Sequence, residues 1–384
     1  MPGEKRNLFP DGETLRTIFS GVDIKPTDCK IISYTFDTCT FSIHPKTAAI
    51  PGHPKDLLIR LEVSGRRLDQ VAAFQKLAHD HLLDLVPPVV SGGTTTTADG
   101  TQVDYAVSEY CTGAIPLEDV WGTLDQENQM RLMDSVVCAV EKVQAINISS
   151  SIQNLGPQSN DALVGGPQLG YFPNIGQLLD GILRASDLER RNCTLSEVDG
   201  GIVLKSDFED IGQAELTRAD LDDLKGHVVF CHNDLEPRNI LVRRVTESNS
   251  PCYDLAAIVD WEMAGFFPFA YEYGIKDNVL GSSNLSFSWY SLFKERTSHL
   301  LPQNACHERF IRALGVIDES KRNGMARNVG VQFQKKWVAA HCVEKSPDVR
   351  RGWVLKAGAK APGHFTKEDN DTFLQQVQEE LGLI

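Results

Sequence analysis

The most regular alternation of apolar and polar positions in the chain occupies residues 56–63, DLLIRLEV. One side of this segment collects Leu57, Ile59, Leu61 and Val63, and the other collects Leu58, Arg60 and Glu62. A period of two with one apolar side predicts a half-buried β-strand. Residues 31–43, IISYTFDTCTFSI, also alternate and are rich in β-branched and aromatic types, so they predict one or two further strands. Residues 102–110 predict another.

Between these strands the period changes to that of a helix, from Arg66 to His79. Its apolar side chains recur three residues apart, at Leu68, Val71, Phe74 and Leu77. The run VPPVV and the Gly/Thr-rich stretch 91–100 predict a loop that ends this helix. The first 110 residues are therefore predicted to form a small α+β unit.

After Tyr110 helical patterns dominate, and we place a domain boundary near residues 110–113. The expected helices cover 125–146, 174–189 and 217–225, with strands at 227–231, 239–243 and 254–260. Thr217 with Asp220 three residues later predicts a capping box at the start of the third helix. Residues 270–384 are expected to be mostly helical, and Thr366 is expected to cap the last helix.

Composition narrows the class of protein. The 384 residues are 41% hydrophobic and 23% charged, as in ordinary globular proteins, and the formal net charge is −14. A net negative charge argues against nucleic-acid binding, and no stretch approaches the apolar length of a membrane span. The nine cysteines contain no C-x-x-C pair, so we expect mostly buried, reduced thiols in a cytoplasmic protein. Oligomeric state is not indicated.

One polar cluster stands between two apolar runs in FCHNDLEPRNILVRR, residues 230–244. It contains the spacing His232-x-Asp234-x-x-x-x-Asn239, and Asp260 later ends the apolar strand of IVDWEMAGF. Phosphoryl transfer from a nucleotide requires Mg²⁺ held against the phosphates and a hydroxyl nucleophile oriented near a carboxylate. Because Mg²⁺ prefers oxygen ligands and keeps much of its water, Asn239 and Asp260 suffice as protein ligands, and Asp234 remains to accept the proton.

Two other readings of this cluster stay open. Asp and Asn are favoured in turns, so the segment is also compatible with a polar hairpin turn. His232 and Asp234 are also possible zinc ligands of a metal hydrolase, although no second cluster shows ligand spacing.

The segment HNDLEPRNILV, followed by IVDWEMAGFFPFAYEY, resembles the catalytic loop of the aminoglycoside phosphotransferase and choline kinase-like family, especially its fungal-type members. AVSEYCTGAIPLEDVW (106–121) resembles the hinge of that family, and DLLIRL resembles the strand that carries a phosphate-contacting cation. The resemblance covers residues 30–275. It implies a protein-kinase-like, bilobal α+β fold. Residues 1–110 would form the nucleotide-covering lobe, and residues 111–384 would carry the catalytic loop, metal site and substrate pocket.

The resemblance also implies roles for single residues and an ATP-dependent reaction on a small-molecule hydroxyl. Asp234 would be the catalytic base, Asn239 and Asp260 would bind Mg²⁺, and Arg60 would neutralise phosphate charge during catalysis. His232 would brace the loop. The backbone of the hinge residues Glu109, Tyr110 and Cys111 would bind the adenine of ATP.

The sequence departs from the family pattern in three places. Two of the departures, at Gln70 and in the missing glycine-rich loop, favour a competing hypothesis, a pseudokinase that binds nucleotide or acts as a scaffold, whereas the intact set of Asp234, Asn239 and Asp260 favours the enzyme. Arg60 replaces the usual lysine, although arginine also grips phosphate. Gln70 occupies the place of the glutamate expected to pair with that cation, which leaves Asp69 or Glu62 as partners. Residues 33–43 lack a glycine-rich phosphate loop, and hydroxyls of Thr35, Thr38 or Thr40 are the possible substitutes.

Two further charged residues have open roles. Arg238 either faces the phosphates or a substrate, or pairs with Glu236 on the surface. Glu262 either binds a cationic substrate or accepts a hydrogen bond from a helix N–H. The aromatics of residues 266–273 are expected in the core. No motif indicates which hydroxyl compound is the acceptor.

Overall fold

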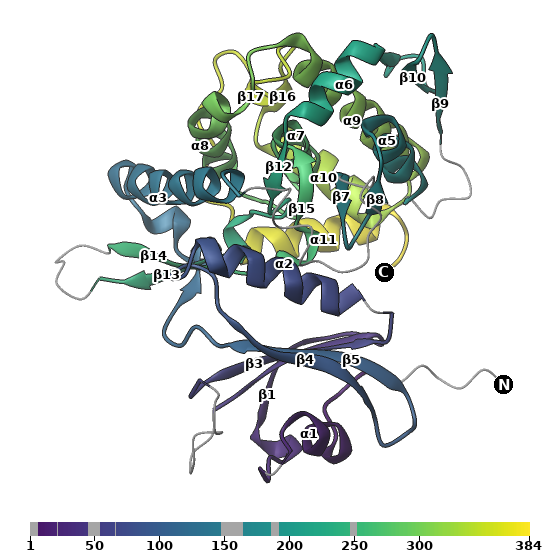
Figure 1. Cartoon of the computed structure of the whole chain (residues 1–384). Coiled ribbons are helices and arrows are strands. Elements are labelled where there is room, and N and C mark those ends of the chain that lie inside the picture. Colours follow the sequence, from purple (N-terminus) through teal and green to yellow (C-terminus); the bar gives the residue numbers. More distant parts are fainter. Residues whose placement is uncertain are drawn as a thin grey trace.

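The computed structural model describes residues 7–20, 22–44, 54–65, 67–146, 164–185, 192–245 and 252–384. A sheet forms the N-terminal part, a larger and mainly helical part follows it, and helix α2 lies between the two (Figure 1). The predicted α+β architecture, a strand-rich N-terminal part followed by a larger and mainly helical part, is confirmed.

The N-terminal sheet has five antiparallel strands in the order β1-β2-β3-β5-β4. They are β1 (Cys29–Tyr34), β2 (Thr38–Ile43), β3 (Leu57–Val63), β4 (Val89–Thr96) and β5 (Gln102–Glu109). The apolar side of β3 packs as predicted into a core with helix α1 (Gly12–Ile18), which the sequence pattern did not reveal. The opposite side of β3, with Arg60, is left to face the rest of the protein.

Strand β4 corrects the prediction of a loop over residues 91–100. Its two glycines, Gly92 and Gly93, lie against Tyr105 of β5, where an added Cβ on Gly93 would stand 3.1 Å from the tyrosine Oη. Gly93 therefore makes room for a large side chain and Gly92 allows a close approach of the neighbouring backbone, and both are roles that glycine has in sheets.

Helix α2 (Arg67–His81) confirms the helix predicted from Arg66 to His79, but it belongs to the core of the larger part. Its Phe74 stacks on Phe230 with ring centroids 5.5 Å apart and meets Phe266 at 5.7 Å. Since Phe230 lies in the strand that precedes the polar cluster of residues 232–239, this packing ties α2 to that cluster.

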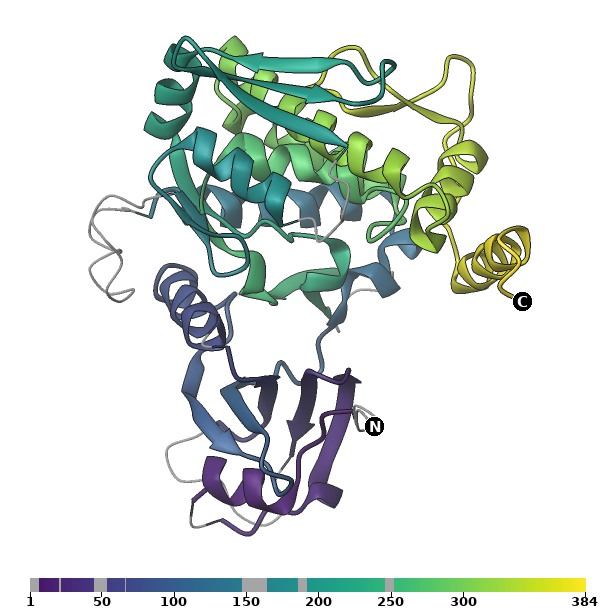
Figure 2. The ribbon, with the colours of Figure 1, turned by 90° about the vertical axis from the view of Figure 1, so that its right-hand side faces the viewer.

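Helices build most of the larger part. They are α3 (Gln126–Gln144), α5 (Ile175–Arg184), α6 (Arg218–Gly226), α7 (Phe269–Val279), α8 (Phe287–Thr297), α9 (Ala305–Gly324), α10 (Val329–Ala340) and α11 (Lys367–Glu380). The predicted capping box of Thr217 and Asp220 is confirmed, and Thr366 caps α11 as expected. Figure 2 shows α11 at the outer edge of the molecule.

Short strands frame the polar cluster. Strand β12 (Val228–Cys231) pairs with β15 (Gly265–Pro268), beyond which lie β7 (Val164–Gly166) and β8 (Gly170–Phe172). Strand β13 (Ile240–Arg244) pairs with β14 (Tyr253–Ile258) and with β6 (Ile115–Pro116). The three predicted strands 227–231, 239–243 and 254–260 are thus confirmed within a few residues.

Nine strands in the described residues of the larger part were not predicted. Four of them, β6, β7, β8 and β15, belong to the same sheets as the three predicted strands. Three others form a sheet, β9 (Cys193–Val198), β10 (Gly201–Ser206) and β11 (Gln213–Leu216), and the last two form a hairpin, β16 (Val343–Lys345) and β17 (Trp353–Leu355). The turn between β9 and β10 is Asp199-Gly200, both with positive φ, of 50° and 76°. This Asp-Gly pair is a hairpin signal that the sequence did contain.

Cysteine burial is lower than predicted. All nine thiols are free, and four of them are buried: Cys39, Cys193, Cys231 and Cys306. Among the helices of the described residues, none is both long enough and apolar enough to cross a membrane.

Candidate active site

The polar cluster forms a tight loop between β12 and β13 that ends in the 3₁₀ turn Pro237–Asn239. The amide of Asn239 donates from Nδ2 to the backbone oxygen and to Oδ2 of Asp234, both at 2.8 Å. Arg238 grips the Asp234 carboxylate with Nη2, at 2.6 and 2.8 Å from its two oxygens. Asp234 and Asn239 are therefore in direct contact, and Arg238 pairs with Asp234 rather than with Glu236.

His232 braces this loop. Its Nε2–H donates to the Val259 carbonyl at 3.0 Å, and its Nδ1 accepts from the Asp234 N–H at 3.2 Å. Burial lowers the pKa of His232 to about 4, so the ring is neutral at pH 7. Because both ring nitrogens are engaged, the zinc-hydrolase reading of His232 is wrong.

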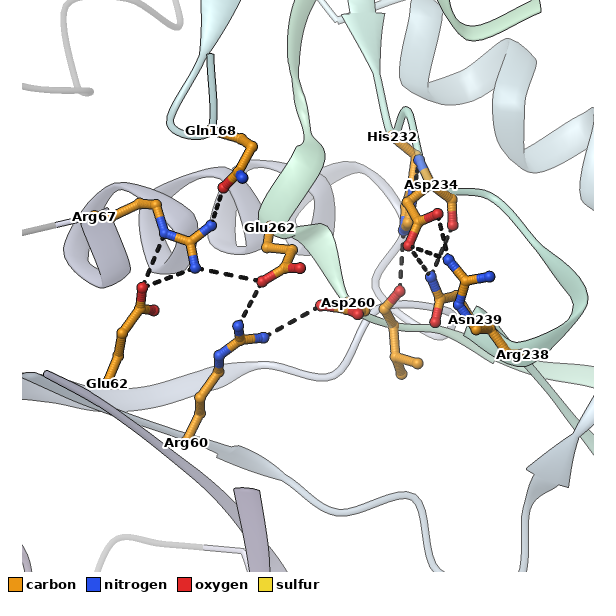
Figure 3. A network of polar contacts seen from close by, with 11 residues as sticks. Arg60, Glu62, Arg67, Gln168, His232, Asp234, Arg238, Asn239, Asp260 and Glu262 are labelled. Atoms are coloured by element: carbon orange, nitrogen blue, oxygen red, sulfur yellow. Dashed lines mark hydrogen bonds and ion pairs between the residues drawn. The ribbon is translucent and has the colours of Figure 1, made fainter. Parts of the chain in front are cut away.

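Asp260 follows β14 in the left-handed region, with φ of 63°, and precedes the 3₁₀ turn Trp261–Met263. Figure 3 shows it between Arg60 on one side and the Asp234–Asn239 pair on the other. Burial, followed by the charge of Glu262, raises the pKa of Asp260 to about 6; Asp234 adds to this rise and Arg60 opposes it. Three carboxylates crowded together in this way favour a bound cation.

Arg60 crosses from β3 to these carboxylates. Its Nη2 lies 2.5 Å from Glu262 Oε2, and its Nη1 lies 3.4 Å from Asp260 Oδ1 (Figure 3). The two roles proposed for Glu262 from the sequence, cationic-substrate ligand and acceptor of a helix N–H, do not describe the contact seen. Glu262 is the ion-pair partner of Arg60.

None of the partners considered for Arg60, which were Gln70 and Asp69 of helix α2 and Glu62 of its own strand β3, forms a hydrogen bond or ion pair with it among the described residues. Gln70 instead accepts from the Tyr171 hydroxyl at 3.4 Å, and Glu62 pairs with Arg67 at 2.8 Å. Arg67 also lies 3.5 Å from Glu262 and donates to Gln168, so Glu262 joins two arginines. Glu262, two residues after Asp260, thus has the role of ion-pair partner that was expected for a residue of helix α2.

The hinge is braced by Asp56. Its backbone oxygen accepts from the Tyr110 N–H at 3.0 Å, and its carboxylate accepts from Thr112 Oγ1 at 2.6 Å. The Glu109 N–H donates to the Pro88 carbonyl. Within the described part of the chain the Cys111 N–H has no hydrogen-bond partner, which leaves it as the free donor of the three predicted hinge residues.

In the turn between β1 and β2, the hydroxyl groups of Thr35 and Thr38 form hydrogen bonds within the turn itself. Thr35 Oγ1 contacts Thr38 Oγ1 at 2.9 Å and accepts from the backbone N–H of Asp37 and Thr38. Two of the three threonines considered as phosphate contacts are therefore engaged within the turn. Thr40 lies opposite Arg60 in the β2–β3 register, beside the cation of the site.

A buried charged layer under the loop was missed by sequence reasoning. Lys276 Nζ lies 2.7 Å from Glu236 Oε1 with both side chains inaccessible, and Glu272 Oε2 accepts from the His232 N–H at 3.2 Å. Burial raises the pKa of both glutamates. The available signal was the pair of charges at i and i+4, Glu272 and Lys276, in a segment whose other residues from Phe269 to Ile275 are apolar or aromatic.

A pocket of about 570 Å³ adjoins the loop at Pro237. Its lining includes Glu118, Asp119, Asn284, His364 and Asn370. Arg238, which grips Asp234, also donates from Nη1 to the backbone oxygen of Ser283 on the pocket wall at 2.9 Å. The aromatics of residues 266–273 lie in the core, as predicted.

Comparison of the sequence with models of known protein families places this chain in one family. The sequence profile of the phosphotransferase enzyme family (APH) matches residues 51–276, which is more than half of the chain. The search of curated proteins returned no match.

Several solved structures are similar at low identity. The GDP and kanamycin complex of APH(2")-IIIa has 14% identity and a TM-score of 0.44, covering 85% of this chain and 94% of that one. The streptomycin–ATP complex of APH(2")-IIa has 12% identity and a TM-score of 0.43, with 97% of each chain covered. Spectinomycin phosphotransferase APH(9)-Ia, with ADP and spectinomycin, has 13% identity and a TM-score of 0.42, covering 84% and 92%. Scores this low carry no argument about a substrate.

Proposed function

We propose, from the premise that this chain belongs to the phosphotransferase enzyme family, that it transfers the γ-phosphoryl group of ATP to a hydroxyl of a small molecule. The observation that carries the proposal is the contact between Asp234 and Asn239, beside the crowded carboxylate of Asp260 and the cation of Arg60. This set supplies the parts that phosphoryl transfer requires.

The residues present fit Mg²⁺ and a nucleotide. Because Asn239 Nδ2 donates to Asp234, the amide oxygen of Asn239 remains for a metal ion. Asp260 offers a carboxylate whose pKa is raised first by burial and then by the charge of Glu262, and a bound cation would relieve both effects. Arg60 Nε is buried and has no hydrogen-bond partner among the described residues, so it is a donor left for a phosphate oxygen. Mg²⁺ held by Asn239 and Asp260 would neutralise charge on the phosphates.

The chain's own residues divide the remaining work. Asp234 orients the acceptor hydroxyl and accepts its proton, while Asn239 and Arg238 fix the carboxylate. Arg60 neutralises phosphate charge and is positioned by Glu262. Of the hinge residues, Glu109, Tyr110 and Cys111, the free N–H of Cys111 is the donor that we assign to the adenine.

We assign the acceptor to the pocket beside Pro237. It opens next to the loop that carries Asp234, and its wall holds the carboxylates of Glu118 and Asp119 together with amides and a histidine. Such a lining suits a polar acceptor that carries hydroxyl groups. The fungal-type affiliation, the cytoplasmic location and the lobe division into residues 1–110 and 111–384 remain parts of this proposal.

The test is a screen for turnover with an unknown acceptor. The purified chain is incubated with a metabolite extract and Mg-ATP, and mass spectrometry detects compounds that gain one phosphate. The same gains should be missing with the Asp260→Ala variant. Phosphorylation that is equal in both samples would contradict the assigned site.

A second candidate is a nucleotide-binding scaffold without turnover. It is favoured by the turn between β1 and β2, whose Thr35 and Thr38 hydroxyls are engaged locally and whose sequence has no glycine. ATP binding does not separate the two candidates, since both bind. Release of ADP above the level of the Asp234→Asn variant supports the enzyme, and equal release supports the scaffold.

A further inference from the structure

A second group of potential metal ligands lies where helix α6 ends and strand β12 begins. Asp223 and His227 come from this segment, four residues apart, and His307 comes from the first turn of α9. One ligand atom of each side chain lies within 4.8 Å of those of the other two. Among the described residues it is the one cluster of three histidine, cysteine or acidic side chains with ligand atoms this close.

His307 has no partner that explains its burial. Its side chain is inaccessible to solvent, and neither ring nitrogen has a hydrogen-bond partner among the described residues. A buried imidazole without partners is costly, because the nitrogens lose their hydrogen bonds to water. The neighbouring ring of His227, 5.4 Å away between centroids and at 80°, offers an edge-to-face contact but takes up neither nitrogen.

Hydrogen bonds fix the orientation of the Asp223 and His227 side chains, and each side chain keeps an atom that can bind a metal ion. Asp223 Oδ2 accepts from Asn304 Nδ2 at 2.6 Å and from the Cys306 thiol at 2.8 Å, which leaves Oδ1. His227 Nδ1 lies 2.8 Å from the backbone oxygen of Asp223. Hydrogen bonds of this kind orient metal ligands and select the imidazole tautomer in known sites. Both side chains are over a third exposed, so an ion can enter from solvent.

We propose that Asp223, His227 and His307 bind one Zn²⁺ ion, at a site separate from the phosphotransfer site. Two imidazoles and one carboxylate suit zinc and similar transition ions, whereas Mg²⁺ selects oxygen ligands. Three protein ligands leave one coordination position of a tetrahedral ion to water. The ion joins the end of α6 to the start of α9.

The position gives the ion a structural task. His227 immediately precedes β12, and β12 leads directly into the loop of His232 and Asp234. Fixing His227 to α9 therefore anchors the strand that mounts the loop. Zinc bound to the folded chain stabilises it by mass action, so the melting temperature rises with zinc concentration.

The test uses the full chain freed of metal with a chelator and then held in excess Mg²⁺, which occupies oxygen-ligand sites. Co²⁺ is the probe, because its visible absorption reports nitrogen ligation. We expect one equivalent of Co²⁺ to bind and Zn²⁺ to displace it. His227→Ala and Asp223→Asn should each weaken Co²⁺ binding by at least about tenfold. These two exposed ligands are chosen because substitution of buried His307 would also perturb folding.

Two controls locate the ion. His299 is an exposed histidine that also pairs with a carboxylate, Glu141 at 3.0 Å, so His299→Ala should leave Co²⁺ binding unchanged. Asp260→Ala should likewise leave it unchanged, because Asp260 belongs to the phosphotransfer site. The proposal is overturned if the native chain binds no Co²⁺ in excess Mg²⁺, if both ligand variants bind it normally, or if Asp260→Ala abolishes binding.

Discussion

Two arginine–carboxylate pairs serve the candidate active site, and they are built in different ways. Arg238 and Asp234 are four residues apart within one loop, whereas Arg60 and Glu262 are 202 residues apart and join the N-terminal sheet to the larger part. Exposure does not separate the pairs, since their side chains are between 19% and 34% exposed. The difference lies in what holds each pair together.

The local pair depends on the backbone of a single loop, which β12, β13 and the buried Lys276–Glu236 pair hold in place. The long-range pair exists only if the sheet approaches the 3₁₀ turn that carries Glu262. Asp234 is therefore positioned whatever the sheet does, but Arg60 reaches the carboxylates only when the two parts come together. The comparison teaches that the position of Asp234, the proposed base, is fixed by its own loop, whereas the position of Arg60, the proposed phosphate-neutralising cation, depends on contact between the two parts.

The largest expected effect is that of removing the base from the local pair. Asp234→Asn should lower turnover by about 10³-fold, because a neutral amide cannot accept the proton of the hydroxyl. The measurement is ADP release with an identified acceptor. Asp254→Asn, the same change in an exposed carboxylate that pairs with Arg131, is the matched control. Turnover that survives in Asp234→Asn would remove the assigned mechanism.

Removing the cation of the long-range pair comes next. Arg60→Met should lower kcat/KM by about 10²-fold, the size expected when a charge that stabilises the transition state is lost. Arg60→Lys should recover part of this loss, because lysine keeps the charge but not the planar fork. Arg131→Met, at a surface ion pair, should have no effect. If Arg60→Met is as active as the native chain, the cation has no part in catalysis.

The pH dependence of metal binding is the third effect. Protons compete with Mg²⁺ for a carboxylate, and the pKa of Asp260, raised to about 6, moves this competition from the usual acid range toward neutrality. The Mg²⁺ concentration for half-maximal activity should therefore rise by about tenfold for each pH unit below about pH 6. A requirement for Mg²⁺ that stays constant down to about pH 5 would show that Asp260 is not a ligand.

The smallest effect is the coupling within the long-range pair. In a double-mutant cycle of Arg60→Ala and Glu262→Ala, kcat/KM should show an interaction energy of about 0.5–3 kcal/mol, as for residues in contact. The same cycle on Arg131 and Asp254 should give less than about 1 kcal/mol. Additive effects at Arg60 and Glu262 would mean that Glu262 does not position Arg60.

Sequence reasoning recovered elements whose cause is local. Alternation predicted β3, and capping residues predicted the starts of α6 and α11. It missed β4, because Gly92 and Gly93 signal a loop until Tyr105 is seen against them, with its ring against Gly93 and its backbone oxygen against Gly92. It also missed β9 and β10, although their Asp199-Gly200 turn was readable. Helix α1 is seven residues long, too short for a clear period.

The contacts of the candidate site also fall into local ones, which the sequence pattern indicated, and long-range ones, which it did not. The spacing of Asp234 and Asn239 predicted that both belong to one site, and the structure shows them in direct contact within a single loop. The partner of Arg60 was expected near helix α2, because the family resemblance implies a glutamate at the position that Gln70 occupies. Glu262 was considered for other roles, since nothing local relates it to a strand 202 residues away.

The amino-acid sequence by itself determined the strands with a clear pattern (β3, β12, β13 and β14), the capped starts of α6 and α11 and the loop that presents Asp234, because these depend on periodicity and on hydrogen bonds between residues close in the chain. Only the tertiary structure decided that Arg60 pairs with Glu262, that Lys276 neutralises Glu236 beneath the loop, and that His307 meets His227 and Asp223. Charges find distant partners through the packing that brings their elements together, and that packing is a property of the whole chain.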